Sequence, residues 1–388
     1  MMKRLLLAMV GLAMMGTPAV GQSLFNAAGL GLSIDGLDGR ARALGNLGIG
    51  LRGGSFLPTD PAALGYLTLS TGVMAAQPSW VDYASEGGVT GKVQGTRFPL
   101  LGIAYPFFQG MMSVQIGSFL DQHYQRTAAG EVPFGGESVA TKDHFDQDGS
   151  ISNLNLGFSR KLGDDYSVGL TVGRYAGSVV RTLTRTYGDD ETTDVDDYIE
   201  QGEWAYKGHS FTLGAGMNVT ESVRVSASVQ VPTNLHAEAT DETRGADQTY
   251  KLPIQYRAGA SALVGTGLTV TGSLQFADWS GAQESLSSVS QAKDSNGFGI
   301  GTELSRARLW GKAMPLRFGY RQTGLPFSLN DTRATEKTFA AGFGLALSTS
   351  GDIVLAAADL AVERGRRSGD GLTENFWRVT ISLLVSGL

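Results

Sequence analysis

The residues that could carry chemistry are few, and their spacing does not define an active site. The chain contains no cysteine, which excludes thiolate catalysis and disulfides. Its four histidines do not pair at the spacing of zinc ligands: His123, His144, His209 and His236. Asp146 and Asp148 before Gly149 match part of a calcium loop, but Asn155 stands where that loop needs a glutamate. These patterns predict neither a metal site nor a cofactor.

One catalytic alternative combines His144 with Ser152. If Ser152 faces lipid together with Leu154, a histidine-activated serine could hydrolyse lipid. No third residue completes a triad in the sequence, and triad geometry is demanding. The sequence therefore favours a protein that is not an enzyme.

A glycine-rich stretch near the N-terminus, "GNLGIGLRGG", suggests at first a phosphate-binding loop. Its spacing is GxxGxG rather than GxGxxG, and no Walker lysine follows it. We expect these glycines to give backbone freedom to a gating segment instead, with Asp60 and Pro61 forming a turn that Asp60 caps. The glycines concerned are Gly45, Gly48, Gly50, Gly53 and Gly54.

Residues 1–21 have the pattern of a secretory signal peptide. "MMKR" is a basic start, "LLLAMVGLAMMG" is a short apolar run, and small residues precede Gln22. Loss of Lys3 and Arg4 would leave 29 basic against 37 acidic residues, a formal charge of −8. This acidic balance argues against a nucleic-acid partner.

Strand-type alternation recurs along the rest of the chain. Leu154, Leu156 and Phe158 share one parity, whereas Asn153 and Asn155 occupy the other. The alternating segments are long: a tilted membrane-spanning strand needs about 9–11 residues, and soluble strands average about 5–6. Strands with one apolar face and one face of small or polar residues are typical of a transmembrane β-barrel. Residues 297–308 alternate weakly, and residues 353–363 are apolar on both parities.

The lengths of the links predict the number of strands. Seven long polar links, among them residues 82–95, 122–150 and 182–202, alternate with six short ones. Outer-membrane barrels have long extracellular loops and short periplasmic turns. We therefore predict an all-β fold, an antiparallel barrel of about fourteen strands with both chain ends on the periplasmic side. A soluble β-sandwich, the alternative, has no reason to alternate its links in this way.

Aromatic residues lie near the predicted strand ends, where interfacial girdles are expected. They are Trp80 with Tyr83, Tyr105 with Phe107 and Phe108, Trp204 with Tyr206, and Trp279.

Three patches resemble the FadL-like outer-membrane transporters of hydrophobic compounds, a broad group that includes PorV-like barrels. The first runs from Arg42 to Leu67 and contains Asp60-Pro61-Ala62-Ala63-Leu64, with aspartate in place of that family's asparagine. The others are residues 250–280, which end in Asp-Trp-Ser, and residues 315–328, with Leu-Arg-x-Gly-Tyr-Arg. The resemblance implies a fourteen-stranded barrel with an N-terminal hatch, passive uptake of fatty acids or hydrocarbons, and a lateral opening.

These observations predict three parts: a signal peptide (1–21), a hatch (22–66) and a barrel (67–388). We expect an outer-membrane channel whose partners are small hydrophobic molecules, membrane lipid, lipopolysaccharide and the barrel-assembly machinery. A PorV-like barrel that binds exported proteins and a general porin are the alternatives. Inward arginines could bind a ligand carboxylate or favour anions, or could pair with inward acids and the hatch: Arg224, Arg257, Arg317, Arg321 and Arg378.

Overall fold

The computed structural model describes residues 23–134, 137–188, 196–286, 290–309, 312–329, 332–351, 353–369 and 371–387. The predicted signal peptide, residues 1–21, lies outside the described residues. No helix within these ranges is long and apolar enough to cross a membrane.

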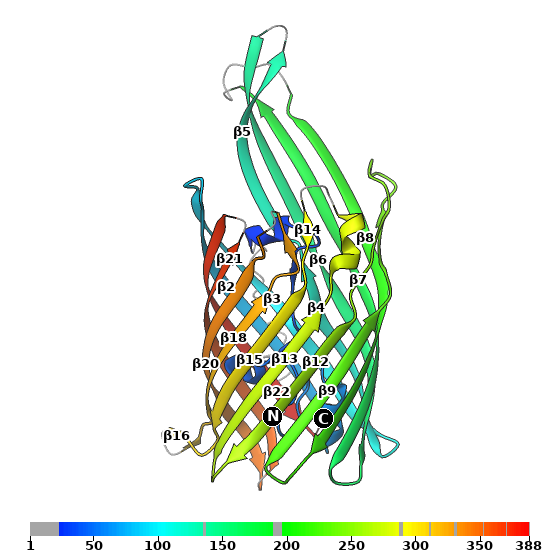
Figure 1. Cartoon of the computed structure of the whole chain (residues 1–388), viewed down its shortest axis with the longest axis vertical. Helices are drawn as coiled ribbons and strands as arrows, with labels where there is room; N and C mark the ends of the chain where they lie inside the picture. The colour runs from blue at the N-terminus through cyan, green and yellow to red at the C-terminus, as the bar shows by residue number, and fades with distance from the viewer. Residues whose placement is uncertain are drawn as a thin grey trace.

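In the described part of the chain, fourteen antiparallel strands close into a barrel, which confirms the number predicted from the link lengths (Figure 1). Round the wall they are β2 (Thr71–Ser85), β3 (Thr90–Phe107), β4 (Gly110–Asp121), β6 (Glu137–Leu162), β7 (Tyr166–Tyr187), β8 (Tyr198–Asn218), β9 (Val223–Pro232), β12 (Gln255–Val264), β13 (Leu268–Ala277), β15 (Ser295–Leu304), β18 (Leu316–Gly324), β20 (Thr335–Ser350), β21 (Ile353–Gly369) and β22 (Leu372–Ser386). The ring closes where β2 pairs with β22, from Thr71↔Ser386 to Ser85↔Leu372.

The remaining elements occupy the lumen and the links. The strands are β1 (Leu32–Ser33), β5 (Tyr124–Phe134), β10 (Leu235–Ala239), β11 (Gln248–Tyr250), β14 (Gln291–Ala292), β16 (Arg308–Leu309), β17 (Lys312–Ala313) and β19 (Phe327–Ser328). The helices of the described ranges are the 3-10 helices η1 (Leu24–Ala27), η2 (Pro61–Tyr66) and η3 (Ser280–Ser285) and the α-helix α2 (Gly39–Ala43).

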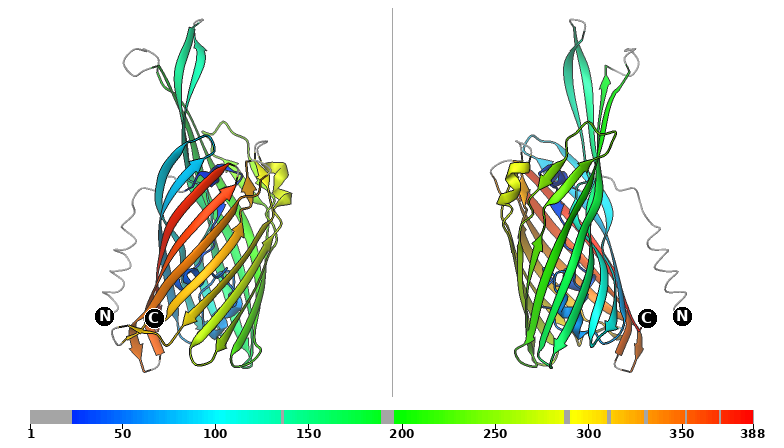
Figure 2. Two further views of the ribbon diagram at one scale, coloured as in Figure 1. Left: turned by 60° about the vertical axis from the view of Figure 1, so that its left-hand side comes forward. Right: turned by 90° about the vertical axis from the view of Figure 1, so that its right-hand side faces the viewer.

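Several stretches predicted as long loops are strands instead. Most of residues 122–150 belongs to β5 and β6, and most of the described part of 182–202 belongs to β7 and β8. Together these four strands rise beyond the barrel as a projecting sheet, at the end opposite the C-terminus (Figure 2). These stretches were predicted as loops because they are polar. A strand with water on both faces needs no apolar face and therefore shows no alternation of apolar and polar residues.

The side-chain alternation within the wall is as predicted. Leu154 and Leu156 point outward with 47% and 55% of their surface exposed, whereas Asn153 and Asn155 are buried. Small polar residues fill the inward parity elsewhere, for example Ser113 on β4. The outer wall is therefore apolar, as lipid contact requires, and the inner wall is polar.

The aromatic girdle is only partly as predicted. Trp80, Tyr105 and Phe108 are exposed on the outer surface, but Trp279 and Tyr206 are buried. These two belong to an apolar cluster inside the barrel mouth, where Trp279 contacts Phe327 with ring centroids 5.1 Å apart. Nearness to a strand end did not distinguish an outward ring from one that points into the mouth.

Candidate functional site in the barrel lumen

The N-terminal segment, residues 23–70, crosses the inside of the ring. Its helix η2 contacts β6, β7 and β8, whereas α2 contacts β18, β20, β21 and β22. These two groups of strands lie on different sides of the wall, and Figure 1 shows the segment in blue within the barrel. The candidate site is therefore the lumen together with this segment.

The glycines of the segment permit close backbone contact with glycines of the wall. A Cβ on Gly50 would collide with the backbone of Gly259 on β12. A Cβ on Gly299 or Gly319 would likewise collide with the backbone at Gly45. Gly45 and Gly50 are thus points of tight packing against the wall. The number of glycines in the sequence could not distinguish this role from backbone flexibility.

The remaining predicted glycines differ in their surroundings. Gly48 and Gly53 have φ of +84° and +81°, but a Cβ on Gly53 would meet no atom within 4 Å. A Cβ on Gly48 would meet the Thr59 side chain, and one on Gly54 would meet Leu67. Gly53 therefore needs glycine for its backbone angle alone.

A compact turn holds the glycine stretch, and two side chains organise it. The Asn46 Oδ1 accepts hydrogen bonds from the amides of Gly48 and Ile49, at 2.7 and 2.9 Å. The Asp60 Oδ2 accepts one from the Gly50 amide at 3.0 Å. Asp60 precedes η2 without a side-chain capping bond, so the predicted local cap is wrong: the carboxylate binds a backbone amide ten residues upstream. Sequence reasoning missed Asn46, although asparagine amid glycines is a turn signal.

Pro61 lies at the start of η2 and packs against the wall. Its backbone fills the space that a side chain on Gly169 of β7 would occupy, and its ring does the same at Gly214 of β8. The fixed φ of proline suits the first position of a helical turn.

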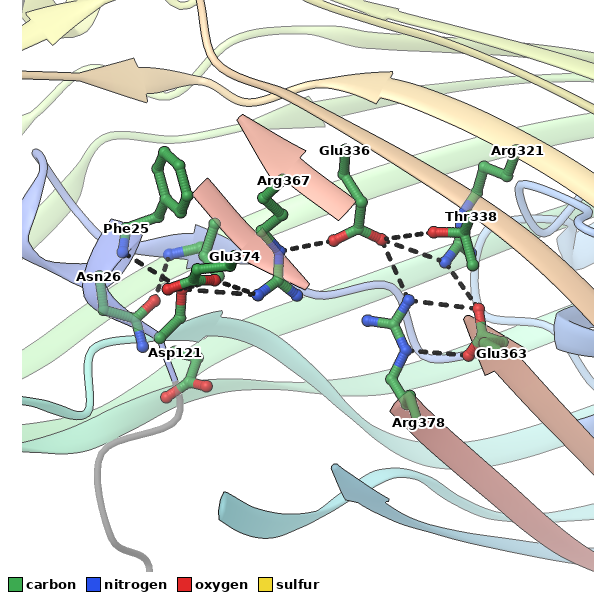
Figure 3. A network of polar contacts seen from close by, with 12 residues as sticks. Phe25, Asn26, Asp121, Arg321, Glu336, Thr338, Glu363, Arg367, Glu374 and Arg378 are labelled. Carbon is green, nitrogen blue, oxygen red and sulfur yellow. Dashed lines mark hydrogen bonds and ion pairs between the residues drawn. The ribbon is translucent and has the colours of Figure 1, made fainter. Parts of the chain in front are cut away.

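A belt of buried charges links the segment to β18, β20, β21 and β22 (Figure 3). Glu336 contacts three guanidinium groups, at 3.5 Å from Arg321, 2.7 Å from Arg367 and 3.0 Å from Arg378. Glu363 binds Arg321 at 3.0 Å and Arg378 at 2.9 Å. Removing one member of such a buried ion pair strongly destabilises the fold, because the other charge is left buried and unpaired.

The belt reaches the start of the segment through Glu374. This carboxylate binds Arg367 at 2.8 Å and accepts hydrogen bonds from the Ser23 hydroxyl and the Leu24 amide. The beginning of the described chain is thereby attached to β21 and β22.

The other predicted inward arginines also contact the segment or its partners. Arg257 binds Asp35 at 3.1 Å, and Arg224 stacks over the Tyr66 ring with its guanidinium carbon 4.1 Å from the centroid. Arg317 binds Asp359 and lies 2.7 Å from Glu303, a carboxylate that Arg40 of α2 also binds at 3.1 Å. All five are buried. Arg257, Arg317, Arg321 and Arg378 form ion pairs with acids, whereas Arg224 stacks on a ring of the segment.

The barrel wall has an unusual junction between β3 and β4. Their pairing runs from Phe107↔Gly110 only as far as Leu100↔Gly117. Beyond this point, Leu120 and Asp121 of β4 pair with Ser33 and Leu32 of β1, and the Ile34 amide donates to the Phe119 carbonyl. The N-terminal segment thus supplies a short strand to the wall where β3 diverges from β4.

Irregular pairing marks the same place. The ladder between β4 and β6 shifts between Ser118 and Leu120, and the ladder between β2 and β3 shifts between Ala75 and Gln77. Pro99 of β3 lies beside this second shift and cannot donate a ladder hydrogen bond. These defects weaken the wall locally, and β1 compensates for the lost pairing.

Two small polar cavities flank residues 33–35. One, of about 60 Å³, lies toward β18 and β20 and is lined by Arg42, Arg321 and Arg378 among others. The other, of about 50 Å³, lies toward β4, β6 and β8 and is lined by Phe119, Asn153 and Arg257 among others. Ser33, Ile34 and Asp35 border both cavities, so this short stretch separates them.

The catalytic alternative has no geometric support. His144 and Ser152 lie on one strand, β6, eight residues apart, which is roughly 26 Å at 3.3 Å per residue. His144 instead contacts the Thr127 hydroxyl at 3.0 Å. Within the described residues no group of three potential metal ligands occurs. Asp148, which belongs to the partial match to a calcium loop, lies 3.0 Å from His123.

Comparisons with known proteins agree with this architecture. No family model matches the chain, and no curated protein matches it by sequence. Among solved structures, a Pseudomonas aeruginosa FadL homologue is similar with a TM-score of 0.65 at 12% identity, over 92% of this chain and all of that one.

Two toluene transporters are similar as well. TodX of P. putida gives a TM-score of 0.59 at 13% identity, over 91% of this chain and 98% of that one. TbuX of Ralstonia pickettii gives 0.57 at 15% identity, over 91% and 99%. The molecule is thus a fourteen-stranded barrel with an occupied lumen. Its fold is that of the FadL-like channels, which confirms at this level the resemblance found in the sequence.

Proposed function

We propose that this protein is an outer-membrane channel for the passive uptake of small hydrophobic molecules, fatty acids or hydrocarbons, gated by its N-terminal segment. In this proposal residues 1–21 direct export, residues 22–66 form the hatch, and residues 67–388 form the barrel. The observation that carries it is the pairing of Leu32 and Ser33 with β4 at the place where β3 diverges.

The outer surface supports the membrane location. Large apolar side chains are exposed along the outward parity of the strands, for example Leu213 at 59% and Ile300 at 53%. In water this surface would promote association, whereas lipid would cover it. The solved channels of the same fold include proteins described as toluene transporters, which supports hydrophobic solutes as the transported class.

The route begins at the mouth of the barrel. There an apolar cluster includes Leu30, Phe119, Trp279 and Phe327, and it offers a first site for an apolar solute. The solute then passes residues 33–35 and leaves between β3 and β4 once β1 has moved away. Passage is diffusive and needs no cofactor.

In this scheme, the predicted gating residues hold the hatch rather than touch the solute. Gly45 and Gly50 set its distance from the wall, and Asp60 closes its turn. The five inward arginines attach the hatch to the wall by electrostatic contacts. A solute carboxylate that displaced one of their partners would weaken this attachment.

A reversible cross-link tests this gate directly. Because the chain has no cysteine, Ser33→Cys combined with Leu120→Cys introduces one pair, at positions that face each other across the β1–β4 ladder. Paired residues of antiparallel strands lie about 4.5–5.5 Å apart at Cα, within disulfide range. In cells that produce the variant, oxidation should reduce uptake of labelled fatty acid and toluene at least tenfold, and a reductant should restore it.

The control is Ala262→Cys with Val270→Cys, which links β12 to β13 and leaves the segment free. Uptake that is unchanged by the Ser33–Leu120 cross-link would contradict the gate. Flux of sugars through the reduced protein would instead favour a general porin. Absence of any flux, together with a co-purifying exported protein, would favour the PorV-like scaffold.

A further inference from the structure

Counted over arginines and carboxylates and extended to the neighbouring pairs Arg97–Asp121 and Arg257–Asp35, the charge belt contains one more cation than anion. His123, which also contacts Asp121, can only add positive charge. Around the cavity toward β18 and β20, the described residues supply six guanidinium groups and five carboxylates. They are Arg42, Arg97, Arg257, Arg321, Arg367 and Arg378, with Asp35, Asp121, Glu336, Glu363 and Glu374.

The ion pairs assign the excess charge to one residue. Each of the other five arginines lies within 4.0 Å of a carboxylate in the belt. Among the ion pairs of the described residues, none includes Arg42. Its Nη2 donates to the Asp35 carbonyl at 3.0 Å, and its Nε has no hydrogen-bond partner.

Arg42 is only 4% exposed and lines the cavity. Burial and the guanidinium group of Arg321, with a further contribution from Arg378, lower the pKa of Arg42 despite the attraction of Glu363. A guanidinium nonetheless stays charged at neutral pH. Glu363 and Asp35 attract this buried charge from a distance, but within the described residues no carboxylate contacts it directly. An anion placed beside it would therefore stabilise it.

We propose that this cavity binds a small monovalent anion, a halide or a small carboxylate, between Arg42 and the guanidinium groups of Arg321 and Arg378. The neighbouring carboxylates do not compete for Arg42: Glu336 is held by three arginines, and Asp35 by Arg257. The available volume of about 60 Å³ accommodates a halide or a formate ion. The proposed ion is a resident ligand distinct from the transported solute, and its site lies between α2 of the segment and the barrel wall.

Two measurements on the full-length protein test the site. In crystals grown in sodium bromide, an anomalous peak is expected beside Arg42. In solution, bromide or formate should raise the melting temperature by a few degrees relative to gluconate at equal ionic strength, because a ligand of the folded state stabilises it. Arg42→Gln should abolish both effects. Arg52→Gln is the matched control, because Arg52 belongs to the same segment and its side chain donates to the Glu221 carbonyl near the surface, away from the charge belt.

Retention of the bromide peak in Arg42→Gln would overturn the proposal. So would a wild-type protein whose melting temperature is equal in bromide, formate and gluconate and whose crystals show no peak. If Arg42→Gln does not fold, Arg42→Lys, which retains the charge, decides the question. The melting temperature of this variant should still rise with bromide, but the half-saturating bromide concentration should be at least tenfold higher. The reason is that a single ammonium group lacks the planar donor set of the guanidinium group.

Discussion

Gly50 of the N-terminal segment and Gly259 of β12 lie backbone against backbone, with no room for a Cβ on either residue. The segment is therefore fitted to the wall at a specific point rather than loosely enclosed by it. The same principle applies at Gly45, which lies against Gly299 and Gly319.

Gly50→Ala should therefore lower the melting temperature more than Gly53→Ala. Both residues have positive φ, +77° and +81°, so both substitutions carry a backbone cost of about 1–2 kcal/mol. Only Gly50→Ala adds a clash, which costs roughly 1–3 kcal/mol more. Thermal unfolding of the two variants in detergent provides the comparison, and equal melting temperatures would show that the close contact does not exist.

Glu336→Gln should destabilise the barrel by roughly 3–5 kcal/mol, because it leaves three buried guanidinium groups short of a carboxylate. Glu238→Gln breaks the exposed pair with Lys207 and should cost about 1 kcal/mol or less. Urea unfolding measures the change in the free energy of unfolding for both variants. If Glu336→Gln lowered the free energy of unfolding as little as Glu238→Gln does, the belt would contribute little to stability.

Asp38 should make stability fall as the pH rises. Burial, and then the Asp359 carboxylate, raise the pKa of Asp38 from its ordinary value of 3.8 to about 6. The folded chain holds this proton more tightly than the unfolded chain, so the favourable contribution is complete below pH 3.8 and is lost as the pH passes 6. The pKa difference corresponds to roughly 3 kcal/mol.

Asp38→Asn should remove this part of the pH dependence. Asparagine can still accept the hydrogen bond from the Ala41 amide that begins α2, at 2.8 Å, but it does not titrate. Between pH 4 and pH 7 the melting temperature of the wild type should decline relative to that of the variant as the pH rises, whatever the other groups contribute to both curves. Parallel curves would rule out Asp38 as the titrating group.

Asp35→Asn should increase hydrophobic uptake several-fold under the proposed gate. Asp35 borders both luminal cavities, and its ion pair with Arg257 holds residues 33–35 against the wall. Lys92→Gln removes an exposed ion pair with Asp82 on the β2–β3 hairpin and should leave uptake unchanged. The measurement is the initial rate of uptake of labelled fatty acid at matched protein levels. Equal rates in wild type and Asp35→Asn would show that the ion pair between Asp35 and Arg257 does not restrain the gate.

The sequence predicted the wall better than the contents of the lumen. Period-two alternation places Leu154 and Asn155 on opposite faces whatever the neighbouring strands are, so their exposure was predictable. The inward direction of Arg321 and Arg378 followed from the same rule. Their partner Glu363 did not, because it lies on a strand whose two parities are both apolar over most of its length.

The pairing of β1 with β4 was beyond sequence reasoning. Leu32 and Ser33 are two residues, too few for a periodic signal, and their partners are about ninety positions away. Arg42 was missed because it lies in a five-residue helix with no clear periodicity. Its significance depends on a charge count over seven strands and the segment, which requires the barrel register.

The docking site of the N-terminal segment has a consequence for the order of assembly. Helix η2 contacts β6, β7 and β8, and α2 contacts strands as late as β22. The surface that receives the segment thus exists only after the last strand has joined the first. The segment precedes all fourteen wall strands in the chain, yet it must be among the last parts to reach its place. Until then β4 presents an open edge at Leu120 and Asp121.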